Sequence, residues 1–123
     1  MRKIDLSANY IVWRKKAPYG FIVLKTSPYT RNGEIWMEGT EGELELIDNV
    51  TIPRIDERSL RMVGFKEQLK PGFYKLETDT KDIYCEKQFG QWEFKVDLEV
   101  VPIENLADLQ SLIFKIKSYS NKR

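Results

Sequence analysis

The sequence predicts an α+β fold: a mostly antiparallel β-sheet of six to eight strands, curled and barrel- or sandwich-like, with one C-terminal α-helix packed on it. Three observations carry this prediction. Apolar and charged residues alternate over residues 92–100, which is typical of a strand with one buried face. The period then changes to that of a helix, with apolar residues three or four positions apart: Leu106, Leu109, Ile113 and Ile116. Upstream, short apolar runs separated by Pro, Gly and Asn predict further strands.

The N-terminal third predicts a β-hairpin over residues 10–26 with a basic tip. Its first strand is aromatic and β-branched over residues 10–13. Pro18 and Gly20 then indicate a turn. The continuous apolar run over residues 21–24 predicts a central strand that is buried on both faces.

The middle of the chain predicts several short strands. Residues 34–37 form one, and residues 43–46 alternate so that Leu44 and Leu46 are expected to face the core while Glu45 faces water. Residues 50–53 predict a brief edge strand, since Pro53 lacks a backbone donor. Residues 55–66 fit neither period and carry no assignment, and residues 73–77 predict another strand.

Residues 82–97 predict the hairpin that leads into the helix. A two-residue turn at Phe89 and Gly90 pairs Cys85 with Phe94 on the buried face, and it also places Glu86 opposite Glu93. Like charges in that position cost about 0.2–1 kcal/mol. A three-residue turn centred on Gly90 would instead pair Glu93 with Lys87, so both registers remain open at this point. The helix is expected to begin near residues 104–105, and residues 118–123 are expected to fray.

Length and composition predict one ordinary globular domain spanning residues 1–123. Hydrophobic residues make up 41% and charged residues 32%, with a net charge of +1. No apolar run approaches a membrane span, and Asp5, Ser7 and Asn9 interrupt what would be the core of a signal sequence. The single Cys85 falls on the buried face of the hairpin and cannot form an internal disulfide. We therefore expect a cytoplasmic protein.

The residue inventory favours a protein that binds over one that catalyses. The chain has no histidine, one cysteine and no phosphate-binding glycine motif. We predict no catalytic residues, no cofactor and no metal site. An enzyme that uses a pair of carboxylates remains the alternative, because such pairs assemble from residues far apart in sequence.

Charge asymmetry identifies the candidate binding region. Residues 1–32 contain seven Lys or Arg and one Asp, whereas residues 33–60 contain two Arg and eight acidic residues. Aromatic residues alternate with the cations of the N-terminal hairpin and the loop that follows it. The predicted binding residues are Arg14, Lys15, Lys16, Tyr19, Lys25, Tyr29, Arg31 and Trp36. Tyr19 and Tyr29 each lie beside a proline in a predicted loop, where binding residues are often displayed.

We expect these residues to form a protein–protein surface on a small adaptor or inhibitor, because interfaces favour aromatic and arginine anchors. Its size would suit an accessory protein of a phage or bacterium. The first alternative is a single-stranded nucleic-acid-binding protein that uses the same cations and rings for phosphates and bases. The second is a barrel or sandwich that carries a small apolar ligand in its interior.

Overall fold

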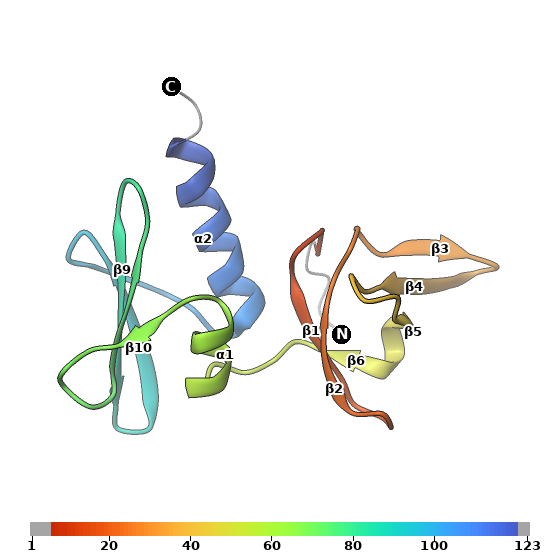
Figure 1. The fold of residues 1–123 in the computed structure, drawn as a ribbon, viewed down its shortest axis with the longest axis horizontal. Helices are drawn as coiled ribbons and strands as arrows, with labels where there is room; N and C mark the ends of the chain where they lie inside the picture. Colours follow the sequence, from red (N-terminus) through yellow and green to blue (C-terminus); the bar gives the residue numbers. More distant parts are fainter. Residues whose placement is uncertain (1–5, 121–123) are drawn as a thin grey trace. The chain divides into compact units, whose positions relative to one another are not determined.

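The computed structural model describes residues 6–120, and it confirms the α+β class (Figure 1). The chain divides into two compact units, Met1–Pro53 and Arg54–Arg123, called unit 1 and unit 2 below. Every strand pairing in the described residues is antiparallel, and the strands form three sheets that are not closed. Whether the two units act as one domain stays a prediction.

Unit 1 contains two three-stranded sheets. One has the order β2-β1-β6 and the other the order β3-β4-β5, and a single bridge between Leu24 and Gly39 connects them. A 3-10 helix, η1 (Ile47–Asn49), leads into β6. The strands are β1 (Ile11–Arg14), β2 (Gly20–Val23), β3 (Tyr29–Arg31), β4 (Glu34–Glu38), β5 (Leu44–Leu46) and β6 (Val50–Thr51).

The predicted N-terminal hairpin is confirmed, since Ile11 pairs with Val23 and Arg14 with Gly20. The prediction that its second strand is central is wrong. β1 occupies the middle of the sheet, because β6 returns from much later in the chain and pairs with Trp13 and Arg14. A long-range pairing of this kind leaves no local signal in the sequence.

The predicted orientation of β5 is also wrong. The alternation is present, but Glu45 is only 5% exposed while Leu44 is 48% exposed. Glu45 pairs with the buried Met37, so both lie on the inner face of their sheet. The physical reason is a counter-charge from another strand, because the side chain of Arg14 reaches Glu45.

Unit 2 is built on a five-stranded sheet with the order β11-β10-β9-β8-β7. One face carries the core residues Tyr74, Leu76, Ile83, Cys85 and Phe94. Its strands are β7 (Lys66–Glu67), β8 (Phe73–Glu77), β9 (Asp82–Gln88), β10 (Gln91–Val96) and β11 (Glu99–Val101). The described residues of both units thus form eleven strands, more than expected, and five of the eleven have only two or three residues.

The hairpin register with a two-residue turn is confirmed. Cys85 pairs with Phe94 and Glu86 with Glu93, whereas Lys87 pairs with Trp92, so the three-residue alternative is wrong. Lys70 compensates Glu86, with its Nζ 2.9 Å from Glu86 Oε1. Cys85 is buried as expected, and this burial raises the pKa of its thiol to about 12.

The unassigned segment contains a short helix, α1 (Glu57–Met62), which begins with a capping box. The backbone N–H of Ser59 donates to Asp56 Oδ1 at 2.8 Å, and the Asp56 N–H donates to Ser59 Oγ at 2.9 Å. Leu60 is fully buried. The helix has six residues, less than two turns, so a helical period could not appear in the sequence.

The C-terminal helix α2 (Leu106–Ser120) forms where the apolar stripe predicts it. All four residues of the stripe are buried, and α2 covers the inner face of the five-stranded sheet (Figure 1). Its first turn is capped by Asn105, whose Oδ1 accepts from the Asp108 N–H at 2.9 Å. Residues 118–120, which we expected to fray, are helical, and residues 121–123 lie outside the described residues.

Candidate functional site

All eight predicted binding residues belong to unit 1, where the structure separates them into two groups. Arg14, Lys15, Lys16 and Tyr19 lie at or next to the tip of the β1–β2 hairpin. The second group comes from β3, β4 and the connection before them, and it contains Lys25, Tyr29, Arg31 and Trp36. The two groups have different environments.

In the hairpin group, two of the cations are committed to a buried carboxylate. Arg14 Nε lies 2.9 Å from Glu45 Oε1, and Lys16 Nζ lies 3.6 Å from Glu45 Oε2. The Nε–H of Arg14 makes no hydrogen bond with a described residue. This buried group therefore contacts Glu45 as an ion pair only. Arg14 therefore helps to hold unit 1 together and is poorly suited to bind a partner, whereas the more distant Lys16 keeps an exposed side chain.

The surroundings of Glu45 favour the ionised form of its carboxyl in spite of its burial. Burial on its own raises the pKa of the Glu45 carboxyl, but four contacts favour the charged form and outweigh it, so the pKa is lowered. The Asn49 amide donates to Oε2 at 2.8 Å, and the Leu46 N–H donates to the same atom at 3.0 Å. The positive charges of Lys16 and Arg14 act in the same direction. Sequence reasoning missed this cluster because its members come from two segments that lie far apart in the chain, residues 14–16 and 45–49.

Lys15, Lys16 and Tyr19 are the exposed members of the hairpin group, and the Lys16 side chain is 56% exposed. The Tyr19 side chain is 67% exposed, as expected of a loop residue beside a proline. Lys15 is exposed too, although its backbone N–H donates to the Asn49 carbonyl at 3.0 Å. The tip therefore displays two cations and one aromatic ring on a backbone that is tied to η1.

In the second group, Tyr29 and Trp36 lie next to each other on the outer face of the β3-β4-β5 sheet. Tyr29 pairs with Trp36, and Trp36 pairs with Leu46, so the three side chains form one row across three strands. Leu44, opposite Glu38, adds a further exposed apolar side chain. Tyr29 was expected in a loop, and it lies instead in β3, where it is half-buried.

We call this surface the outer face of unit 1, and its members are Lys25, Tyr29, Arg31, Glu34, Trp36, Glu38, Leu44 and Leu46. The register supports this assignment, because residues directly opposite each other on neighbouring strands share a face. The Lys25 N–H donates to the Glu38 carbonyl at 2.9 Å, which brings Lys25 beside β4. Lys25, Glu38 and Leu44 also line a shallow depression of about 220 Å³.

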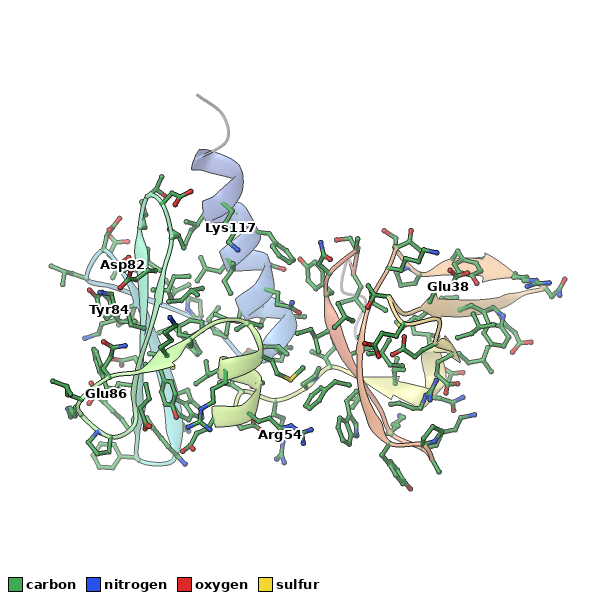
Figure 2. The ribbon with its side chains drawn as sticks, viewed as in Figure 1. Glu38, Arg54, Asp82, Tyr84, Glu86 and Lys117 are labelled. Atoms are coloured by element: carbon green, nitrogen blue, oxygen red, sulfur yellow. The ribbon has the colours of Figure 1, made fainter. Side chains whose placement is uncertain are left out.

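Glu38 fixes the Tyr29 ring at this face. The Tyr29 hydroxyl donates to Glu38 Oε1 at 2.9 Å, and Figure 2 shows Glu38 on the sheet that contains β3 and β4. This hydrogen bond, with partial burial and the negative charge of Glu38, raises the pKa of the Tyr29 hydroxyl. A ring held in one position loses little conformational freedom when a partner covers it.

The sheet of unit 2 has an outer face of a different kind. Figure 2 shows Asp82, Tyr84 and Glu86 on the side of β9 that faces away from α2. Charges of opposite sign alternate there, with Lys75 Nζ 3.6 Å from Asp82 Oδ2 and 5.8 Å from the centre of the Tyr84 ring. The charged groups of this face are thus paired with one another, which is typical of a face exposed to solvent.

The described residues contain no group of three or more His, Cys, Asp or Glu side chains placed to hold a metal ion. Within the same residues, no helix is long and apolar enough to cross a membrane. Whether the chain is an enzyme stays a prediction.

Comparisons with known proteins identify no family for this chain. No protein-family model, no curated protein and no solved structure matches the chain.

Proposed function

We propose that this chain is a small non-enzymatic binding protein, an adaptor or inhibitor, that recognises another protein through the outer face of unit 1. The single observation that carries the proposal is the row of Tyr29, Trp36 and Leu46, half-buried side chains on three adjacent strands. Aromatic side chains with polar neighbours are the anchors that protein interfaces favour. We further propose that the protein acts in the cytoplasm.

Charge favours a protein partner over a nucleic acid. Arg14, one of the cations that a phosphate backbone would need, is largely buried against Glu45, and Lys16 lies 3.6 Å from the same carboxylate. On the outer face of unit 1 the two cations Lys25 and Arg31 alternate with Glu34 and Glu38, so the face has no net charge. A mixed face of this kind supports specific contacts with a protein and gives little attraction to a polyanion. A carrier of a small apolar ligand has less support, because the sheets are not closed.

The test uses paired surface variants of the intact chain. Tyr29→Ala with Trp36→Ala removes two rings from the outer face of unit 1, while Phe73→Ala with Tyr84→Ala removes two rings in contact on the outer face of unit 2. Each variant is immobilised, and proteins captured from a cell lysate are quantified by mass spectrometry and then titrated individually. We expect the first pair to weaken binding of the main partner roughly tenfold or more, and the second pair to leave it unchanged.

Arg14 and Lys16 are unsuitable for this test, because their loss would leave the carboxylate of Glu45 buried with fewer partners. Equal binding by both pairs of variants would refute the assignment of the surface. Binding of a labelled single-stranded oligonucleotide that weakens steeply from 50 to 200 mM salt, and is lost in the Tyr29→Ala, Trp36→Ala variant, would replace the proposal with the nucleic-acid alternative.

A further inference from the structure

The turn between β9 and β10 carries a bulky apolar residue where the backbone disfavours one. Phe89 has a φ of +52° and Gly90 a φ of +77°, which are the left-handed conformations of a type I′ turn. Asn, Asp and Gly are preferred at such positions, and a large side chain there costs conformational energy. Packing within unit 2 does not offset this cost, because the Phe89 side chain is fully exposed, at 103% of the reference area. Folding of unit 2 therefore gives no reason for a phenylalanine at this position.

Phe89 lies beside an open depression of about 400 Å³ on the same unit. The depression has mainly apolar walls, and its lining residues include Phe89, Trp92, Val100, Val101, Pro102 and Ile103. It lies where the sheet is incomplete. β11 pairs with β10 only from Phe94 to Val96, so no described strand pairs with residues 91–93 of β10 on that side. A free strand edge next to apolar pockets is a common way to bind an extended segment of another protein.

The charges around the depression specify the partner further. Its only charged lining residues, among those that the structure describes, are Glu93 and Glu104. Glu93 is paired with Lys95 at 3.6 Å, and both side chains are partly exposed, so this pair is weak and exchangeable. A segment that carries Lys or Arg would complement the two carboxylates.

We propose that unit 2 has a second binding site, independent of the outer face of unit 1, for an extended segment of another protein in which apolar and cationic residues alternate. The segment continues the sheet along residues 91–93 of β10. Its apolar side chains enter the depression against Phe89 and Trp92, and its cations face Glu93 and Glu104. Phe89 is retained at its unfavourable position because it contacts this partner.

Two synthetic peptides test the occupant. One alternates valine with lysine and the other alternates valine with glutamate, each with acetylated and amidated ends, and each is titrated into the isotopically labelled full chain. We expect the lysine peptide to shift backbone amide resonances of residues 88–93 and of residues 100, 101, 103 and 104, and the glutamate peptide to shift none. Equal binding of both peptides, or shifts confined to other residues, would overturn the proposal. Binding to anionic lipid vesicles without binding to the lysine peptide would overturn it as well.

Phe89→Asn separates a binding role from a structural one. Asparagine suits a positive φ, so this variant is expected to unfold at the same or a higher temperature than the wild type, while its affinity for the lysine peptide falls at least tenfold. Leu98→Asn is the matched control, since Leu98 also has a positive φ, +69°, and is 96% exposed, but lies in the turn between β10 and β11 and does not line the depression. We expect it to leave the affinity unchanged. A lower unfolding temperature for Phe89→Asn, or an unchanged affinity, would contradict the proposal.

Discussion

The two units organise their interiors in different ways, although both show the same alternating sequence pattern. Unit 2 has an apolar inner face, and its ion pairs lie at the surface, such as Lys70 with Glu86. Unit 1 places the charged side chain of Glu45 on its inner face and an apolar row on its outer face. Alternation in the sequence therefore shows which residues share a face of a strand. Counter-charges and hydrogen-bond donors from other segments decide which of the two faces is buried.

The largest effect should come from removing the buried carboxylate of unit 1. We expect Glu45→Ala to lower the free energy of unfolding by roughly 3–5 kcal/mol, because Arg14 would remain buried without its counter-charge. Urea denaturation followed by tryptophan fluorescence measures this loss. In a Trp92→Phe background, the remaining Trp13 and Trp36 both report on unit 1. A loss below about 1 kcal/mol would mean that the two interiors do not differ as described.

The second prediction concerns the pH dependence of the same carboxylate. The pKa of Glu45 is lower in the folded state than its ordinary value of 4.5, so ionised Glu45 stabilises the folded state at neutral pH. This contribution is complete above the unfolded-state pKa and disappears as the pH falls through the folded-state pKa. The Glu45→Gln variant should therefore lose less stability than the wild type between pH 6 and pH 3. Parallel curves for the two proteins over this range would exclude a role for Glu45 in acid unfolding.

A smaller effect is expected at the N-terminus of α1 in unit 2. Asp56→Ala removes the acceptor for the Ser59 N–H, and we expect a loss of about 1 kcal/mol in the free energy of unfolding. Asp56→Asn keeps an acceptor oxygen and serves as the control, with a loss of a few tenths of a kcal/mol. The Trp92 fluorescence, in a Trp13→Phe, Trp36→Phe background, reports on this unit. Equal losses in the two variants would show that the cap is not the source of the effect.

The smallest effect should come from a surface ion pair of unit 2. Lys70 Nζ lies 2.9 Å from Glu86 Oε1, but the Lys70 side chain is largely exposed. We expect Lys70→Ala to change the free energy of unfolding by less than about 1 kcal/mol, and the change should shrink further in 1 M salt. The same denaturation experiment at two salt concentrations checks this. If Lys70→Ala lowered the free energy of unfolding as much as Glu45→Ala does, the ion pairs of the two units would not differ in the way described.

Several elements were predictable from the sequence because their signals are local. The period of the C-terminal helix and the turn at residues 89–90 led to the observed α2 and hairpin register. The alternation over residues 92–100 predicted β10 but is wrong as a single strand, because the chain turns back after Val96 into β11 and leaves Leu98 and Val100 exposed. The N-terminal hairpin followed from an apolar run on each side of a turn. Elements of two to six residues, such as β7 and α1, were too short for a period to show.

The candidate binding residues also depend partly on local sequence and partly on tertiary structure. Composition and charge pointed to Tyr19, Tyr29 and Trp36 as binding residues, and these choices depend only on residue type and local context. Tertiary structure decided that Arg14 and Lys16 neutralise Glu45, because the three residues meet only when β1 lies beside the segment that follows β5.

What the sequence determined by itself was therefore the period, the turns and the list of aromatic and charged side chains, all of which depend on neighbours in the chain. Only the tertiary structure decided which face of each sheet is buried, since a carboxylate can enter an interior when distant residues supply compensating charges and hydrogen bonds. That decision turned Leu44 and Leu46 outward beside Trp36, and it created the outer face that we propose as the binding surface.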